Sequence, residues 1–151
     1  MFRDLKVMKK ILVPVDFSDI TTEVLDYAIH LASEDAGAIT VLHVAPLNPI
    51  FPGPDSEPMM IQSYVEEELE REKEELQAIT EHIQKQGVEA ESVLLQGSII
   101  ETIIDEAKEL HADMIIMGKE SHGLLYRTLL GTTSEGVIRR SHVPVLIVPE
   151  K

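Results

Sequence analysis

The chain has 151 residues, of which 44% are hydrophobic, and it carries no cysteine and a formal net charge of −14. That length suits a single domain with its own core, and the lack of cysteine excludes disulfide bonds and thiol chemistry. The strongly acidic balance disfavours nucleic acid and anionic membranes as partners, because both carry negative charge.

The N-terminal segment shows no targeting or membrane signal. No apolar run approaches the roughly 20 residues that cross a bilayer, and residues 1–10 carry charges without a hydrophobic stretch of the signal type. We therefore expect a cytoplasmic protein. Residues 1–8 precede the first predicted strand and are expected to be an N-terminal extension with little structural role.

The first part of the chain shows the pattern of a strand, a helix and a second strand. Residues 11–15 are a short apolar run rich in β-branched side chains, which is typical of a strand buried on both faces. Residues 16–19 offer turn and N-cap oxygens, and apolar residues at helical spacing then run from Val24 toward Gly37, which predicts a helix with a glycine stop. Residues 39–45 repeat the strand pattern, so we expect a parallel pair.

A proline-rich segment and an acidic helix come next. Residues 46–58 hold five of the eight prolines, which predicts a long loop. From Ile61 onward an apolar stripe recurs at three- and four-residue intervals among many glutamates, which predicts an amphipathic helix that ends near Gly87. We interpret the glutamates as the solvated face of that helix rather than as an acidic recognition motif.

The remaining elements complete an alternating pattern. They are a strand over 88–95, a helix over 98–110 capped by Ser98, a buried strand over 114–117, a helix over 132–140 and a strand over 143–148. Five strands that alternate with four helices predict a doubly wound α/β sheet with right-handed crossovers.

Ligands of an open α/β sheet bind beyond the carboxyl ends of its strands. That rule selects the residues after the first strand, Pro14–Asp16, and after the fourth, Met117 and Gly118. The segment Gly131–Ser134 leads directly into a helix, where hydroxyl groups and free N–H groups bind phosphate. The same residues also make a good helix N-cap, so both interpretations stay open. The two commonest nucleotide motifs, the P-loop and the dinucleotide glycine motif, are missing.

The sequence resembles the universal stress protein family across residues 9–149. Residues 9–18 are similar to the family's first strand and turn, residues 41–44 to its second strand and residues 112–118 to its fourth. Residues 129–148 match its last helix and strand. The resemblance implies a three-layer, doubly wound α/β fold of the adenine nucleotide alpha-hydrolase-like type, with five parallel strands in the order 3-2-1-4-5.

ATP-binding members of that family carry glycine, two residues, glycine, nine residues, and then glycine with serine or threonine. In this sequence the corresponding positions are Gly118, Ser121, Gly131 and Thr132, so serine replaces the second glycine of the motif. If that position needs a positive φ, Ser121 costs about 1–2 kcal/mol. Its hydroxyl can offset part of that cost by donating to a phosphate. The resemblance implies a site for ATP, ADP or AMP, with Mg²⁺ held through the phosphates.

The residues that the resemblance assigns to the nucleotide form two groups. Those on the adenine and ribose side are Pro14, Val15, Asp16, Val44 and Met117. Those on the phosphate side are Gly118, Ser121, Gly131, Thr132, Thr133 and Ser134. Asp16 is equally expected to be the N-cap of the first helix, and the two roles are compatible.

Catalysis and metal binding find little support. No serine, histidine and aspartate are arranged as a triad, so at most slow, Mg²⁺-dependent ATP hydrolysis is expected. The six histidines show no i, i+4 pairing and no carboxylate at ligand spacing, so we expect structural roles for them and no protein-held metal.

Two functions remain in competition. In one, ATP or AMP changes the order of residues 46–58 and 118–130, and the protein acts as a nucleotide-dependent switch in stress response or signalling. In the other, the pocket has degenerated and the protein is a nucleotide-free dimeric interaction module. Both hypotheses include an unknown protein partner and a homodimer through residues 143–148, because an apolar edge strand left unpaired invites aggregation.

Overall fold

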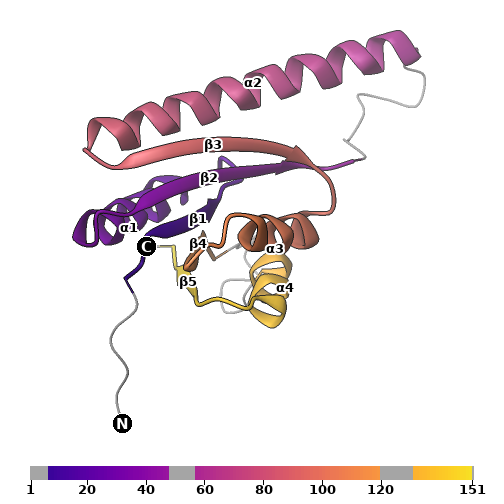
Figure 1. Cartoon of the computed structure of the whole chain (residues 1–151). Coiled ribbons are helices and arrows are strands. Elements are labelled where there is room, and N and C mark those ends of the chain that lie inside the picture. The colour runs from indigo at the N-terminus through magenta and orange to yellow at the C-terminus, as the bar shows by residue number, and fades with distance from the viewer. Residues whose placement is uncertain (1–6, 48–56, 120–130, 151) are drawn as a thin grey trace.

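The computed structural model describes residues 7–47, 57–119 and 131–150. Strands and helices alternate along these ranges, as predicted (Figure 1). The elements are β1 (Lys10–Pro14), α1 (Thr21–Glu34), β2 (Ala38–Ala45), α2 (Pro58–Lys85), β3 (Glu89–Gln96), α3 (Ile99–Glu109), β4 (Met114–Gly118), α4 (Thr132–Arg140) and β5 (Val145–Val148). None of the helices within these ranges is long and apolar enough to cross a membrane.

The strands form one parallel sheet in the order β3-β2-β1-β4-β5, which confirms the predicted order 3-2-1-4-5. At the centre, Ile11 of β1 pairs with Ile39 of β2 on one side and with Met114 of β4 on the other. The chain moves outward from β1 through β2 to β3 and then returns to the far side of β1. Ligand crevices of open α/β sheets form at such a switch point.

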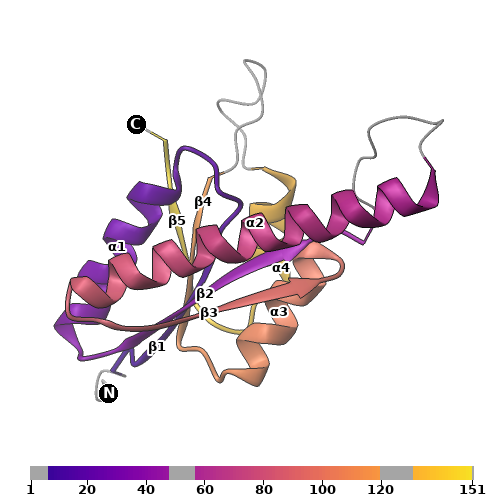
Figure 2. The same ribbon diagram turned by 90° about the horizontal axis from the view of Figure 1, so that it is seen from above.

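Helices cover both faces of the sheet, so the fold has three layers (Figures 1 and 2). Val24 of α1 and Leu76 of α2 join one buried cluster, and Ile103 of α3 and Val137 of α4 join another. Successive residues of a strand point to opposite faces, and β1 contributes to both clusters. Burial on both faces explains why β1 has a continuous apolar run rather than an alternating one.

Helix α2 begins earlier than predicted, and it reaches past the sheet at its N-terminal end (Figure 2). The sequence predicted a loop through Pro58 and a helix from Ile61, but Pro58 lies in the first turn of the helix. A proline is tolerated there because the first N–H groups of a helix have no intrahelical partner. At the other end, Gly87 has a φ of 83° just past the C-cap Gln86, which confirms the predicted end.

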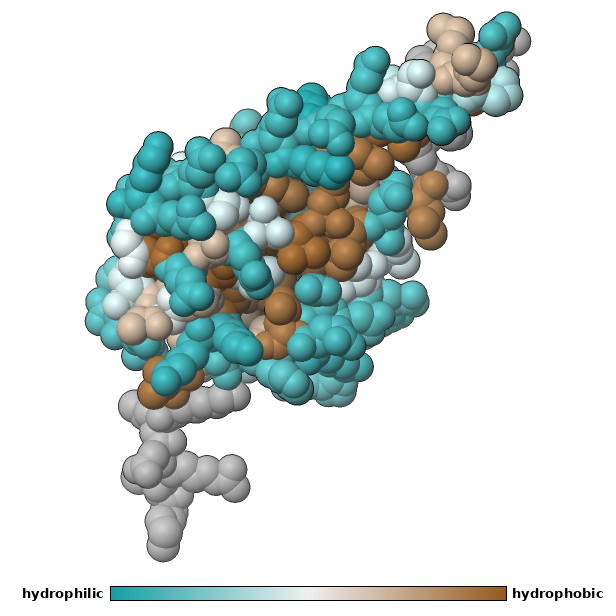
Figure 3. All heavy atoms as spheres, turned by 45° about the horizontal axis from the view of Figure 1, so that its top comes forward, coloured by the Kyte–Doolittle hydropathy of each residue, from teal (hydrophilic) through white to brown (hydrophobic). Residues whose placement is uncertain are grey.

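The glutamates of α2 mostly face solvent, as the teal band along this helix in Figure 3 shows. Arg71 forms exposed ion pairs with Glu68 and Glu75, and the hydrogen bond from Arg71 lowers the pKa of Glu68. Glu72 is different because it is only 9% exposed. The predicted solvated face is therefore wrong for this one glutamate.

The start of α1 also differs from the prediction. The helix begins at Thr21, its N-cap is Ile20, and no side chain caps it. The prediction that Asp16 caps α1 is therefore wrong. Its Oδ1 instead accepts a hydrogen bond from the backbone N–H of Ser18 at 3.0 Å, within the turn that precedes the helix. Likewise, Ser98 occupies the N-cap position of α3 without a capping bond from its side chain.

The end of α1 uses a glycine for space rather than for its backbone conformation. The left-handed residue is Ala36, with a φ of 50°. A Cβ on Gly37 would lie 2.8 Å from the carbonyl oxygen of Met8, closer than such contacts allow. Gly37 therefore lets the turn pass against the segment that precedes β1.

Strand β5 is shorter than the predicted range 143–148, although it lies at the edge of the sheet as expected. Val145–Val148 pair with β4. Just before them, the carbonyl of Pro144 accepts a hydrogen bond from the N–H of Ile115 at 3.0 Å. The other side of β5 has no neighbouring strand within the described residues.

Candidate functional site

A cavity of about 270 Å³ lies beyond the carboxyl ends of β1, β2 and β4, at the switch point of the sheet. Val15, Val44 and Met117 supply apolar surface from the three strand ends. Ile20 and Val24 add apolar surface from the start of α1. An apolar cavity with a few polar groups at its margin is the usual form of a small-molecule site.

The structure brings most of the residues proposed from the sequence to this one cavity. Those that line it are Pro14, Val15, Asp16, Val44, Met117, Gly118 and Thr133. Gly131, Thr132 and Ser134 belong to the same N-terminal turn of α4, but they are not part of its lining in the described portion of the chain. Ser121 and residues 48–56 and 120–130 lie outside the described residues.

Ser134 has a structural contact that accounts for its burial. Its side chain is fully buried, and its Oγ donates a hydrogen bond to the carbonyl oxygen of Gly118 at 3.1 Å. The bond ties the first turn of α4 to the end of β4. Because the hydroxyl proton is already used, the side chain of Ser134 has no hydrogen to donate to a phosphate in this arrangement, although its backbone N–H belongs to the first turn of α4.

Gly118 allows β4 and α1 to approach closely. A Cβ at this position would lie 2.7 Å from Cγ2 of Ile20 and 3.4 Å from Cγ2 of Val24. A side chain here would therefore push Ile20, which itself lines the cavity. This requirement for space is separate from any contact between the backbone and a phosphate.

The turn between β1 and α1 forms one rim of the cavity. Besides the bond from Asp16 to Ser18, the N–H of Thr21 donates to the carbonyl of Ser18 at 3.0 Å. Phe17 has a φ of 61°, a left-handed conformation that is unusual for a bulky residue. The centroid of its ring lies 4.5 Å from the centroid of the His43 imidazole ring.

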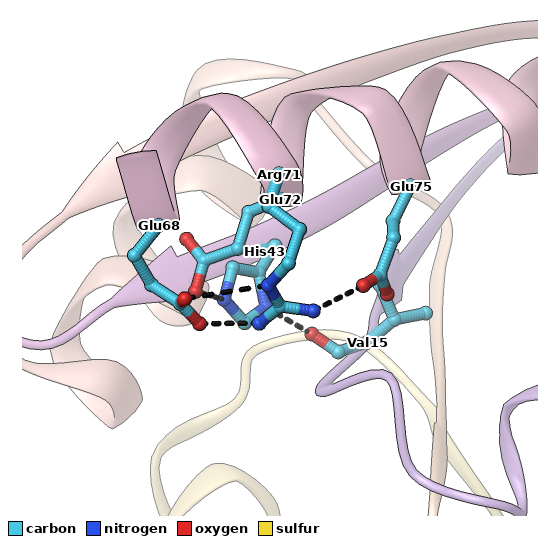
Figure 4. Close-up of polar contacts among 6 residues, drawn as sticks. All are labelled: Val15, His43, Glu68, Arg71, Glu72 and Glu75. Atoms are coloured by element: carbon cyan, nitrogen blue, oxygen red, sulfur yellow. Dashed lines mark hydrogen bonds and ion pairs between the residues drawn. The ribbon is translucent and has the colours of Figure 1, made fainter. Parts of the chain in front are cut away.

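His43 was assigned only a structural role from the sequence, yet it lines the cavity. Its Nδ1 lies 2.7 Å from the carbonyl oxygen of Val15, and its Nε2 lies 3.2 Å from Oε1 of Glu72 on α2. Figure 4 shows the imidazole between these two partners. The alternation along β2 could have placed His43 on the face of Val41, toward α1 and α2, but only the tertiary structure identifies Glu72.

Several further lining residues were missed at the sequence level. They are Ser18, Asp19, Ile20, Thr21, Val24, Leu42, Ile99, Ile103, Lys119 and Glu150, together with His43. Six of these eleven residues lie within four positions of a selected residue along the chain, so a wider selection around each strand end would have found those six. Ile99 and Ile103 come from α3, and nothing in their spacing distinguishes them from core residues.

The polar lining is mixed in charge. Asp16, Asp19 and Glu150 bring carboxylates and Lys119 brings an ammonium group, while Thr133 stands at the start of α4. Within the described residues, no group of three or more histidines or acidic side chains could hold a metal ion. The cavity can thus accept a ligand that has three parts: an apolar part, hydroxyl groups that donate hydrogen bonds to the carboxylates, and an anionic end that lies near the N-terminus of α4.

Comparison with known proteins yields a consistent family assignment. The model of the Universal stress protein family matches residues 8–149. A universal stress protein of Methanocaldococcus jannaschii, MJ0531, is 33% identical over 142 residues, which are 93% of this chain and 81% of the relative.

Solved structures agree with this assignment. The structure of MJ0577, another universal stress protein of Methanocaldococcus jannaschii, superposes with a TM-score of 0.82 at 28% identity and covers 97% of this chain and 99% of that one. A universal stress protein from Archaeoglobus fulgidus in complex with dAMP gives 0.67 at 26% identity, covering 94% and 98%. The sheet order and these neighbours confirm the adenine nucleotide alpha-hydrolase-like fold, and the chain belongs to the universal stress protein family.

Proposed function

We propose that the chain binds an adenine nucleotide, ATP or AMP, in the cavity beyond β1, β2 and β4. The observation that carries the proposal is that apolar side chains from three strand ends and a residue of the first turn of α4 line one cavity. Apolar surface suits a purine base. The N-terminus of α4 suits a phosphate, because its first N–H groups lack intrahelical partners and carry the positive end of the helix dipole.

The acidic residues of the lining suggest how the nucleotide is oriented. Ionised carboxylates such as those of Asp16 and Asp19 only accept hydrogen bonds, so ribose hydroxyls suit them and phosphate oxygens do not. We therefore assign the ribose to the side of Asp16 and Asp19 and the phosphates to the side of Thr133. Mg²⁺ would be held mainly by the phosphates. The dAMP complex of the 26% identical relative supports this class of ligand.

Within this proposal the protein is a cytoplasmic, nucleotide-dependent switch in stress response or signalling, with at most slow ATP hydrolysis. A homodimer through β5 is part of the proposal, supported by the position of that strand at the edge of the sheet. In a dimer, occupancy of the cavity would alter the surface offered to a protein partner.

Isothermal titration of the nucleotide-free protein with ATP and Mg²⁺ tests the proposal. We expect micromolar affinity for the wild type and a loss of at least about tenfold in Thr133→Glu, which places a negative charge beside the phosphates. Arg139→Gln is the matched control, because it changes the net charge by the same single unit at an exposed position near the other end of α4. No heat up to millimolar ATP would favour the nucleotide-free interaction module instead.

A further inference from the structure

His43 connects three elements through its ring. The residue lies on β2 and is 9% exposed, and its two nitrogens face the carbonyl of Val15 after β1 and the carboxyl group of Glu72 on α2 (Figure 4). A carbonyl oxygen can only accept, so Nδ1 must carry a hydrogen and donate it to Val15 at 2.7 Å. The state of Nε2 is then decided by Glu72.

Glu72 differs from the neighbouring glutamates of α2. Glu68 and Glu75 are more exposed and pair with Arg71, whereas Glu72 is buried with His43 at 3.2 Å from its Oε1. Its Oε2 is buried and has no hydrogen-bond partner among the described residues. Burial of a carboxyl group with so few hydrogen-bond partners costs free energy of folding, so its contact with His43 is not an incidental surface pair.

The two side chains must share one proton. If Glu72 is ionised, Nε2 carries a hydrogen and the ring is an imidazolium. If Glu72 is protonated, its hydroxyl donates to Nε2 of a neutral ring. In both states the pair is neutral as a whole and both ring nitrogens are engaged, which fixes the orientation of the imidazole.

The orientation of the ring matters for the rim of the cavity. Val15 lines the cavity, and its backbone is held on both sides, since its N–H donates to the carbonyl of Leu42 at 2.8 Å and its carbonyl accepts from His43. Two residues later Phe17 adopts its unfavourable positive φ with its ring against the imidazole. Asp16, which also lines the cavity, lies between these two anchored residues.

We infer that Glu72 and His43 are positioning residues for the bound nucleotide. Glu72 orients the imidazole of His43, and the imidazole holds the carbonyl of Val15 and the ring of Phe17 so that Asp16 meets the ligand. Glu72 acts from outside the cavity, through a helix that the proposed site does not otherwise use. The effect on affinity rests on the proposed function, whereas the arrangement of the ring does not.

Three variants test this inference. Glu72→Met keeps the volume of the side chain but removes the partner of Nε2, and we expect it to weaken ATP binding by about tenfold. Glu72→Gln should stay within about threefold of the wild type, because its amide can donate to Nε2 of a neutral ring. Glu75→Met lies one turn further along the same helix at a more exposed position and should leave the affinity within about twofold.

Nuclear magnetic resonance of the ligand-free proteins supplies a second readout. With ¹⁵N-labelled histidine, the wild type should show a hydrogen on Nδ1 of His43, and Glu72→Met should change the Nε2 resonance together with the backbone amides of residues 15–17. Wild-type affinity and unchanged amides in Glu72→Met would overturn the inference. If the wild type binds no nucleotide, the proposed function fails, and the ring and amide resonances alone decide whether Glu72 holds His43 and the rim.

Discussion

Replacing Gly118 with alanine tests how closely β4 packs against α1 at the cavity. The new Cβ would lie 2.7 Å from Cγ2 of Ile20, which is buried, and Cγ2 belongs to a stiff β-branched side chain that cannot simply swing away. Overpacking of this kind costs about 1–3 kcal/mol, and burial of the added methyl group returns at most about 0.8 kcal/mol. We therefore expect a net loss of about 1–2 kcal/mol in the free energy of unfolding.

Urea unfolding at 25 °C measures this loss. With an m-value near 2 kcal/mol/M, the midpoint should fall by about 0.5–1 M without a change in m. A double-mutant cycle with Ile20→Ala isolates the clash: the two substitutions together should cost less than the sum of their separate effects. A Gly118→Ala protein as stable as the wild type, or strict additivity in the cycle, would refute the packing argument.

Three further substitutions probe individual contacts. Ser134→Ala leaves the carbonyl of Gly118 without its buried donor and should lower the free energy of unfolding by about 1–3 kcal/mol in the same urea assay; no change would show that the bond is dispensable. Gly87→Ala places a Cβ at a φ of 83° in open space and should cost about 1–2 kcal/mol from backbone strain alone, whereas a gain in stability would exclude that conformation. Burial, with repulsion from Glu109 and Glu91, raises the pKa of Glu106, so its charged form is disfavoured in the folded state. Glu106→Gln should therefore stabilise by about 0.2–0.5 kcal/mol at pH 7, and this gain should disappear below the ordinary glutamate pKa of about 4.3; a gain that persists at pH 3.5 would contradict the assignment.

The fold was predictable because its strongest signals are local. The continuous apolar runs of β1 and β4 indicate strands buried on both faces, and they lie at the centre of the sheet. Alternation of strands and helices then leaves few topologies, and the order follows from the family resemblance. Element boundaries were less predictable: Pro58 begins α2 rather than ending a loop, because the first turn of a helix tolerates proline.

The site was predictable only as far as it follows strand ends. Val15, Val44 and Met117 meet at one cavity because parallel strands end at the same edge of the sheet. The sequence did not reveal the roles of residues that depend on contacts between distant segments. The sequence offered Asp16 as a helix cap, since it carries a suitable oxygen, but the chain makes a further turn before α1 begins.

The pairing of Glu72 with His43 was hidden for a different reason. In the sequence Glu72 stands among many glutamates of one amphipathic helix, but it follows Leu69 by three residues and precedes Leu76 by four, so helical periodicity places it on the apolar stripe and could have indicated its burial. Its partner could not be predicted in this way, because the residue that Glu72 meets depends on where the helix crosses the sheet. Ser134 is a similar case, because a serine in a first helical turn looks like a phosphate ligand until its bond to Gly118 is seen.

The most direct test of the proposed function is a nuclear magnetic resonance titration of the ¹⁵N-labelled protein with ATP and Mg²⁺. Binding in the cavity predicts saturable shifts of the backbone amides of Val15, Asp16, Val44, Gly118 and Thr133, with little change along the exposed face of α2. The absence of shifts up to millimolar ATP, or shifts that gather away from the carboxyl ends of β1, β2 and β4, would contradict a nucleotide site in this cavity.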